Sequence, residues 1–344
     1  MFLFILKLFL FFLLFNNMVL ANVITDVVCS LIQPDSKNAS FYLYTKSIDD
    51  YSITADANSI EKAPFTADSN TVIFIIHGFG ASRTTSDIVT LRKAFISAQE
   101  EYNIVMVDYH DVTGDVSKSN IITEGLEYIE FIHCDFKNVV TTITDMIVSI
   151  QSSRPEITYI QLVGHSIGAQ LAGEAGNTLR GMGKTIDRVS GLDPAAPGFF
   201  LSSITPESAI FVDVTHTQIG NLYGAAESSG NVDFYFNNAV IQDGCRNEKT
   251  HEMALKCSHS SAVYYFADSI KNQNIMASRC DKIKEIVQDV FALNNIDKNN
   301  NNELSSVCSQ EAKNDGNKIV YGEYVSLEAN GVYFVKIAKV PNSS

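Results

Sequence analysis

The chain has 344 residues, of which 46% are hydrophobic and 19% charged, an ordinary composition for a folded globular protein. This composition excludes disorder, a collagen-like repeat and a coiled coil as descriptions of the whole chain. The 25 basic and 39 acidic residues give a net charge of −14. We therefore expect neither nucleic-acid binding nor electrostatic docking on anionic membranes.

The first 21 residues have the pattern of a secretory signal peptide. Lys7 precedes an apolar run, residues 8–15, that is too short to cross a bilayer. Val19-Leu20-Ala21 then supplies a small residue for cleavage. A buried N-terminal helix or a membrane anchor is the alternative interpretation. We expect a secreted, extracellular protein with a mature domain at residues 22–344 and no transmembrane anchor.

Short apolar runs alternate with longer helix-like segments along the chain. Runs rich in β-branched residues predict strands at residues 71–76, 104–107, 158–163, 186–190 and 210–214. Helical patterns follow at residues 94–102, 138–151 and 169–179, and residues 318–340 predict a final pair of strands. Such alternation predicts an α/β fold with a mainly parallel central sheet and helices on both faces. Since no linker or repeat divides the chain, we expect a single catalytic domain.

The pentapeptide Gly164-His165-Ser166-Ile167-Gly168 has the form G-x-S-x-G. A predicted strand enters it and a small-residue helix leaves it, which is the context of a nucleophile elbow. The glycines permit a tight turn that holds the serine in a strained conformation with its hydroxyl exposed. A bystander serine in a glycine-rich turn is the alternative. We predict Ser166 as a catalytic nucleophile.

A serine nucleophile needs a base and an acid that orients the base, and elbow enzymes supply them in the order Ser, Asp, His. Asp193 follows a predicted strand, at the edge of the sheet where ligand sites form. His251 and His259 both lie beyond it. His259 opens an apolar-periodic helix directly after Cys257, whereas His251 lies in a polar stretch typical of a solvated loop. We therefore predict Asp193 and His259 as the partners of Ser166.

Acyl transfer also requires N–H donors for the tetrahedral oxyanion. Ile167, the residue after the nucleophile, is predicted to supply one backbone N–H. Phe79 is predicted to supply the second, because His77-Gly78-Phe79-Gly80 follows an early strand. His77 is expected to shape this turn and not to act as a base.

The six cysteines form an even set that fits three disulfides in a secreted chain. They are Cys29, Cys134, Cys245, Cys257, Cys280 and Cys308, and six cysteines allow 15 connectivities. No pair has the close spacing of a zinc site, and we expect neither a metal nor an organic cofactor. Asn38, in Asn38-Ala39-Ser40, is the better of two candidate N-glycosylation sites.

Taken together, several motifs resemble the pancreatic-lipase-related family of secreted α/β hydrolases, in character closest to its phospholipase A1 members. They are His77-Gly78-Phe79, Gly164-His165-Ser166-Ile167-Gly168-Ala169, Gly191-Leu192-Asp193-Pro194-Ala195, Val212-Asp213-Val214-Thr215-His216-Thr217, Val232-Asp233-Phe234-Tyr235 and Cys257-Ser258-His259. The resemblance implies an α/β-hydrolase fold over about residues 29–340. It also implies the triad Ser166, Asp193 and His259, with Phe79 and Ile167 as oxyanion donors.

The resemblance further implies the disulfides Cys29–Cys134, Cys245–Cys257 and Cys280–Cys308. The chain departs from the family pattern at Gln170, Gln218 and Ser261, where the family usually has His, Asp and Arg. It also ends before the lipid-binding β-sandwich of pancreatic lipases, so no colipase-type partner is expected.

The implied activity is a carboxylic-ester hydrolase that releases a fatty acid from glycerolipids at a membrane, micelle or emulsion interface. The candidate lid between Cys245 and Cys257 has 11 residues, and residues 218–232 are also few and polar. In the family, a short lid and a short neighbouring loop are typical of phospholipase A1 members, whereas long ones are typical of triacylglycerol lipases. Phospholipase A1 activity is therefore the leading expectation. A triacylglycerol lipase and a catalytically silent lipid-binding or yolk-type protein are the alternatives.

Overall fold

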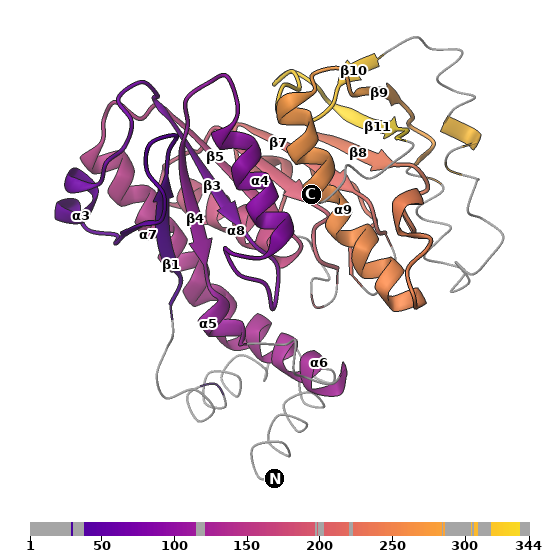
Figure 1. The fold of residues 1–344 in the computed structure, drawn as a ribbon, viewed down its shortest axis with the longest axis horizontal. Coiled ribbons are helices and arrows are strands. Elements are labelled where there is room, and N and C mark those ends of the chain that lie inside the picture. Colours follow the sequence, from indigo (N-terminus) through magenta and orange to yellow (C-terminus); the bar gives the residue numbers. More distant parts are fainter. Residues whose placement is uncertain are drawn as a thin grey trace.

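The computed structural model describes residues 29, 38–114, 121–196, 198, 203–219, 223–283, 285, 304, 306–308 and 318–337. Within these residues one eleven-stranded sheet has the order β10-β9-β11-β8-β7-β6-β5-β3-β4-β1-β2 (Figure 1). The strands are β1 (Ser40–Tyr44), β2 (Tyr51–Ile53), β3 (Thr71–Ile76), β4 (Asn103–Asp108), β5 (Tyr159–His165), β6 (Arg188–Leu192), β7 (Phe211–His216), β8 (Val232–Phe236), β9 (Met276–Arg279), β10 (Lys318–Val320) and β11 (Gly331–Val335).

The seven strands from β4 to β11 in the middle of this order pair in parallel, whereas β1, β2, β9 and β10 add antiparallel strands at the two edges. The predicted α/β fold with a mainly parallel sheet is thus confirmed. Successive side chains of a strand point to opposite faces. Phe74 and Ile76 of β3 accordingly belong to one hydrophobic core, and Ile73 and Ile75 to the other. A central parallel strand that is apolar along its whole length requires helices on both faces.

Helices cover both faces of the sheet. They are α3 (Ala57–Lys62), α4 (Ser86–Ile96), α5 (His110–Thr113), α6 (Ile121–Glu130), α7 (Phe136–Ser153), α8 (Ile167–Gly181) and α9 (His251–Lys271), with single turns η2 (Phe131–Asp135), η3 (Pro206–Ser208) and η4 (Asp243–Cys245). α7 and α8 pack on the core that contains Phe74, while α4 and α9 pack on the core that contains Ile73. In Figure 1, α4 and α9 lie side by side on the near face.

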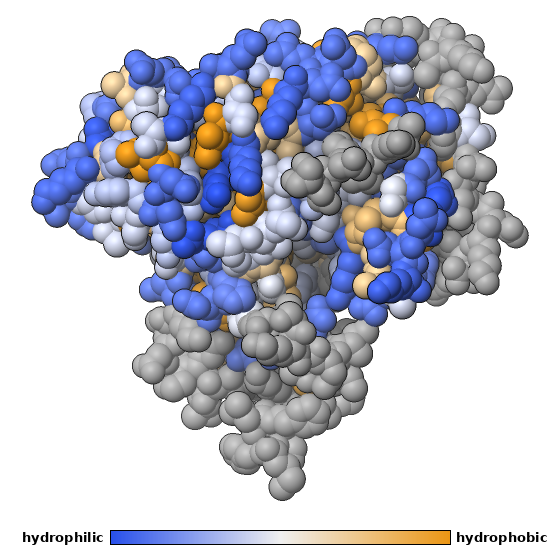
Figure 2. Space-filling model, viewed as in Figure 1, coloured by the Kyte–Doolittle hydropathy of each residue, from blue (hydrophilic) through white to orange (hydrophobic). Residues whose placement is uncertain are grey.

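Most of the surface in the same view is hydrophilic, with small apolar patches between polar side chains (Figure 2). No helix in the described part of the chain is both long and apolar enough to cross a membrane. The predicted signal peptide, residues 1–21, lies outside the described residues. Asn38 is exposed, two residues before β1 begins.

Three helix and strand predictions are wrong in detail. The helix expected at residues 94–102 is α4, which begins at Ser86 and ends at Ile96, because its buried face is set by Ile88, Leu91 and Phe95. α9 begins at His251 and not at His259, because Thr250 caps it by accepting a hydrogen bond from the Met253 N–H.

The third correction concerns the last two strands. β10 and β11 both join the sheet, but they do not pair with each other, because β9 lies between them. β9 has the sequence Met-Ala-Ser-Arg, which is too short and too polar to stand out as a strand pattern.

The described cysteines are all paired. The disulfides are Cys29–Cys134, Cys245–Cys257 and Cys280–Cys308, with Cα–Cα distances of 5.3, 5.7 and 5.4 Å. These are the pairings that the family resemblance implied. Each distance lies within the ordinary range for a disulfide.

Candidate active site

Ser166 lies in the turn between β5 and α8 with φ 58° and ψ −123°, a backbone conformation that residues other than glycine rarely adopt. Gly164 and Gly168 must both be glycine, because other backbone atoms approach their Cα atoms too closely to leave room for a side chain. A Cβ on Gly164 would lie 2.2 Å from the Gly168 carbonyl oxygen, and a Cβ on Gly168 would lie 2.4 Å from the Ile76 carbonyl oxygen. The turn therefore has the strained strand–turn–helix geometry that defines a nucleophile elbow.

Asp193 and His259 are 66 residues apart in the sequence, and the fold brings them into direct contact. His259 Nδ1–H donates to Asp193 Oδ2 at 2.6 Å. Asp193 Oδ1 accepts the backbone N–H groups of Thr217 and Gln218 at 2.7 and 3.1 Å. The Asp193 side chain is fully buried, and three donors satisfy its carboxylate. This arrangement fixes the ring orientation of His259 and leaves Nε2 as the nitrogen that can accept a proton.

Two aromatic rings flank the His259 imidazole. The His165 ring centroid lies 4.7 Å away, and His165 Nε2–H donates to the His259 carbonyl oxygen at 3.2 Å. Burial and the neighbouring His259 lower the pKa of His165 to about 4, so His165 is neutral at physiological pH. Tyr223 stacks on His259 with its ring centroid at 5.4 Å and an interplanar angle of 27°. Sequence reasoning missed both contacts, and Tyr223 carries no sequence signal because it lies in a short polar connection.

Ser166 directly precedes α8 and follows His165, whose ring contacts the His259 imidazole. Among the described contacts, however, no hydrogen bond joins Ser166 Oγ to His259. Hydrogen bonds of this kind are commonly long in unliganded enzymes and tighten when substrate binds. The structure thus joins Asp193 to His259, and the bond from His259 to Ser166 stays a prediction.

The turn at residues 77–80 lies against the serine. A Cβ on Gly78 would lie 3.2 Å from Ser166 Cβ. His77 Nδ1–H donates to the Gly78 carbonyl oxygen at 2.8 Å, and His77 Nε2 accepts the Tyr109 N–H at 3.1 Å. A trans peptide points its C=O and N–H in opposite directions, so this bond orients the Phe79 N–H away from His77. His77 is fully buried and shapes the turn, as the sequence indicated.

Phe79 and Ile167, the predicted oxyanion donors, are sequence neighbours of Gly78 and Ser166, which approach each other closely. Within the described residues, neither backbone N–H donates to another backbone group. The Phe79 ring is held edge-on against Tyr128 and Phe131, at centroid distances of 5.1 and 6.0 Å. The role of the two amides as oxyanion donors stays a prediction.

The three departures from the family pattern are each accommodated by internal hydrogen bonds. Gln170 donates to the Ala195 carbonyl oxygen at 2.7 Å and accepts the Ser203 N–H at 2.8 Å. Gln218 Oε1 accepts the Gly224 N–H at 3.2 Å, and Ser261 Oγ donates to the Cys257 carbonyl oxygen at 2.9 Å. These side chains brace the backbone around the site and take no part in the contact between Asp193 and His259.

The candidate lid is half helical. Residues 251–256 form the first turns of α9, and exposed His251 is the first helical residue and not a loop residue. Met253 is 45% exposed, whereas Ala254 and Leu255 are buried. Lys256 lies 3.8 Å from Glu124 of α6, which ties the lid to a second helix.

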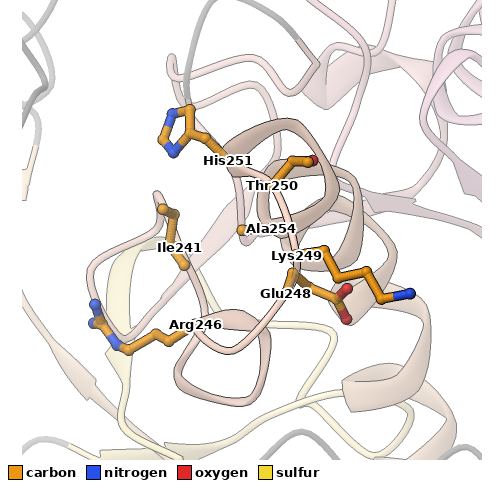
Figure 3. Close-up of a pocket in the computed structure, with 7 residues that line it drawn as sticks. All are labelled: Ile241, Arg246, Glu248, Lys249, Thr250, His251 and Ala254. Carbon is orange, nitrogen blue, oxygen red and sulfur yellow. The ribbon is translucent and has the colours of Figure 1, made fainter.

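A shallow cavity of about 260 Å³ lies on the lid itself. Its lining residues are Ile241, Arg246, Glu248, Lys249, Thr250, His251 and Ala254. Figure 3 shows Ile241, Arg246 and His251 along one side of the opening, with the Lys249 and Glu248 side chains pointing away from it. None of the three predicted triad residues lines this cavity. In the described residues no group of three or more His, Cys, Asp or Glu side chains could hold a metal ion.

The sheet order and the elbow define the class of protein as an α/β hydrolase. A family model described as Lipase matches residues 17–313, which is most of the chain. The chain therefore belongs to the Lipase family, and the resemblance found in the sequence is confirmed.

Two kinds of relative are similar to this chain. A phospholipase A1 from Vespa crabro is 32% identical over 58% of this chain and 66% of its own length. A pancreatic triacylglycerol lipase from Myocastor coypus is 30% identical over 70% of this chain and 54% of its own length. The chain thus spans between about half and two thirds of these relatives. A solved α/β serine hydrolase without a lid, XC6422 from Xanthomonas campestris, is 16% identical over 44% of this chain and 61% of its own, with a TM-score of 0.30.

Proposed function

We propose that this protein is a secreted serine carboxylic-ester hydrolase that releases a fatty acid from glycerolipids. Ser166 is the nucleophile, His259 the base and Asp193 the acid that orients it, with the Phe79 and Ile167 amides as oxyanion donors. The observation that carries the proposal is the 2.6 Å hydrogen bond from His259 Nδ1 to Asp193 Oδ2, and the positive φ of Ser166 in the elbow turn supports it.

Each step of the reaction then follows from a named group. His259 Nε2 takes the hydroxyl proton as Ser166 Oγ attacks the ester carbonyl, and Asp193 stabilises the imidazolium that forms. The Phe79 and Ile167 N–H groups stabilise the oxyanion. The alcohol leaves with the proton from His259, and an acyl-enzyme results. His259 then activates a water that releases the fatty acid.

For the substrate we propose a phospholipid cleaved at its sn-1 ester, which is phospholipase A1 activity. The lid supports this choice, because Met253 is its only large exposed apolar side chain and five of its 11 residues are charged: Arg246, Glu248, Lys249, Glu252 and Lys256. Burying a few such side chains changes the free energy by only a few kcal/mol, at roughly 25 cal/mol per Å². The lid therefore gates the site weakly and leaves room for a polar headgroup. The similarity to a phospholipase A1 supports the same substrate.

A triacylglycerol lipase is the second candidate. The observation in its favour is that pancreatic triacylglycerol lipases from Myocastor coypus and Cavia porcellus match 70% and 72% of this chain, a longer stretch than the Vespa crabro relative matches. On either substrate the protein would act at a lipid interface. Three disulfides and an exposed glycosylation sequon at Asn38 support an extracellular location.

Labelling with a fluorophosphonate probe tests the catalytic proposal. The wild-type protein should react covalently at Ser166, and the Ser166→Ala variant should not. Absence of labelling in the folded wild-type protein would favour a catalytically silent lipid-binding protein. Rates on sn-1-labelled phosphatidylcholine and on emulsified triolein then separate the two substrates. Faster triolein hydrolysis, with a rate jump as the emulsion forms, would favour the triacylglycerol lipase.

A further inference from the structure

A second buried His–Asp pair lies on the neighbouring strands β7 and β8. His216 is the last residue of β7 and Asp233 belongs to β8, and His216 Nε2 lies 2.9 Å from Asp233 Oδ1. Both side chains are at least 98% buried. The Tyr235 ring stacks on His216 at a centroid distance of 4.2 Å. No step of the proposed reaction uses these three side chains.

All three side chains hold the connection between β7 and β8. His216 Nδ1 lies 3.1 Å from the Ala225 carbonyl oxygen, and the Tyr235 hydroxyl donates to the Ala226 carbonyl oxygen at 2.7 Å. The Asp233 carboxylate accepts the N–H groups of Ser229 and Gly230 at 3.0 and 3.2 Å. Residues 223–230, the pinned loop, are therefore anchored to the sheet by side chains at both ends.

The same loop closes over the catalytic pair. Its backbone bonds to the residues after Asp193: the Ala225 N–H donates to the Pro194 carbonyl oxygen at 2.7 Å, and the Ala196 N–H donates to the Tyr223 carbonyl oxygen at 2.8 Å. A Cβ on Gly224 would lie 2.6 Å from Asp193 Oδ2, so the loop backbone packs directly on the carboxylate.

Tyr223 begins the pinned loop, and its ring stacks on the His259 imidazole. β7 and β8 are neighbours in the sheet, and α9 packs on the near face of that sheet (Figure 1). His165 lies against His259 as well, so the imidazole has two ring neighbours from two different segments.

We infer that Tyr223 is a positioning residue for His259. His216 and Asp233 act through Tyr223, because they fix the pinned loop and so hold the Tyr223 ring against His259. The inference rests on the proposed hydrolase function. An aromatic face attracts a cation more strongly than a neutral ring, and His259 is neutral in the ground state and cationic in the transition state. The contact therefore stabilises the transition state more than the bound substrate, which affects kcat and not KM.

The test compares single variants of the full-length enzyme on a soluble short-chain nitrophenyl ester. Tyr223→Leu should lower kcat about 3- to 30-fold with KM within twofold of wild type. Tyr223→Phe keeps the ring and should retain nearly full kcat. Tyr51→Leu, at a tyrosine on the edge strand β2, is the matched control and should leave both constants unchanged. An unchanged kcat in Tyr223→Leu, or a rise in KM alone, would overturn the inference.

A double-mutant cycle tests whether His216 affects the reaction by holding Tyr223 in place. If His216 acts through Tyr223, the variant His216→Gln/Tyr223→Leu should be no slower than the slower single variant. Fully additive losses would overturn the role of His216. Since His216 is buried and its variant could fail to fold, Tyr235→Phe is the second route. It keeps the stack on His216 and loses the bond to Ala226, and it should lower kcat only when Tyr223 is present.

Proton NMR separates failure of this inference from failure of the proposed function. The His259 Nδ1–H in the 2.6 Å bond should give a low-field resonance in wild type. Tyr223→Leu should shift or broaden this resonance, and Tyr51→Leu should not, whether or not the protein hydrolyses esters. An inactive, unlabelled wild type would contradict the proposed function alone. An unperturbed resonance in Tyr223→Leu would contradict the positioning role alone.

Discussion

Buried aspartates lie toward both ends of the central strands, but one orients the proposed catalytic histidine and the other pairs with a buried arginine. At the carboxyl ends, Ser166 and Asp193 both have positive φ, and Asp193 is bonded to a histidine that faces the proposed reaction. Toward the amino ends, Asp213 of β7 accepts from Arg188 Nε at 2.7 Å and from Ser190 Oγ at 2.8 Å, all within regular strands. Among Ser166, Asp193 and Asp213, the positive φ therefore occurs at the two residues of the proposed site and not in the regular strand that carries Asp213.

The amino-end cluster ties a distant segment to the sheet. Arg188 is 2% exposed, and its Nη1 and Nη2 donate to the carbonyl oxygens of Glu323 and Gly322 at 2.7 and 2.9 Å. Burial alone would lower the pKa of Arg188, but the charges of Asp213 and Glu323 outweigh it and raise this pKa. Asp213 Oδ2 is buried without a hydrogen-bond partner in the described part of the chain. We therefore expect substitutions at the carboxyl ends of the strands to change activity, and substitutions in the Arg188 cluster to change the stability of the fold.

Removing the nucleophile should separate the two ends most strongly. Ser166→Ala should lower kcat roughly 10⁴- to 10⁶-fold, the scale expected when a triad nucleophile is lost. The thermal midpoint should stay close to that of wild type, because Ala has a similar volume. Ester hydrolysis and calorimetry on the purified variant measure both quantities. Near-normal turnover would refute the elbow assignment.

Asp193→Asn should have the next largest effect. The amide oxygen can still accept the N–H groups of Thr217 and Gln218, but the NH₂ group then takes the place of Oδ2, where it can neither accept from His259 Nδ1–H nor stabilise an imidazolium. We expect kcat to fall about 10⁴-fold. Asp213→Asn is the paired control at the other end, and its specific activity per folded molecule should be close to wild type. A comparable loss of kcat in both variants would remove the distinction between the two ends.

Arg188→Met should show the reverse pattern. The change leaves Asp213 and Glu323 without their buried cation, and breaking such a pair destabilises by about 3 to 5 kcal/mol. Denaturant unfolding should report this loss, and kcat per folded molecule should change less than twofold. A normal unfolding midpoint with impaired turnover would show that the cluster serves the reaction after all.

Glu323→Gln should give the smallest effect, visible in the pH dependence of stability. Burial raises the pKa of Glu323 above its ordinary value of 4.5, with Arg188 opposing the shift. The folded state therefore holds this proton more tightly than the unfolded state. The resulting stabilisation is fully present below pH 4.5 and is lost as pH rises through the folded pKa.

Unfolding curves between pH 4 and 8 check this sign. Glu323→Gln should remove the wild-type decline in the free energy of unfolding that accompanies rising pH in this window. Exposed Glu328 lies in the same segment, and Glu328→Gln should keep the decline. A steeper decline in Glu323→Gln would contradict the raised pKa.

Much of the fold and of the site is visible in local sequence patterns. The strand at residues 71–76 matches β3 at both ends, because an unbroken apolar run between polar residues has one way to be buried in a parallel sheet. The pentapeptide around Ser166 is local as well, since its two glycines meet obstacles within the turn and on the adjacent strand β3. The sequence order also predicted the pairing of Asp193 with His259, which the structure shows as a hydrogen bond.

Only the tertiary structure reveals the contacts between segments that are far apart in the sequence. The Arg188 cluster depends on a segment 135 residues away, and the stack of Tyr223 on His259 depends on the pinned loop and α9 meeting. The position of β9 between β10 and β11 is likewise set by pairing across the sheet. Periodicity reports which residues are buried along one element, because it reflects the geometry of that element alone. Which elements become neighbours depends on sheet order and packing, and no local pattern encodes that choice.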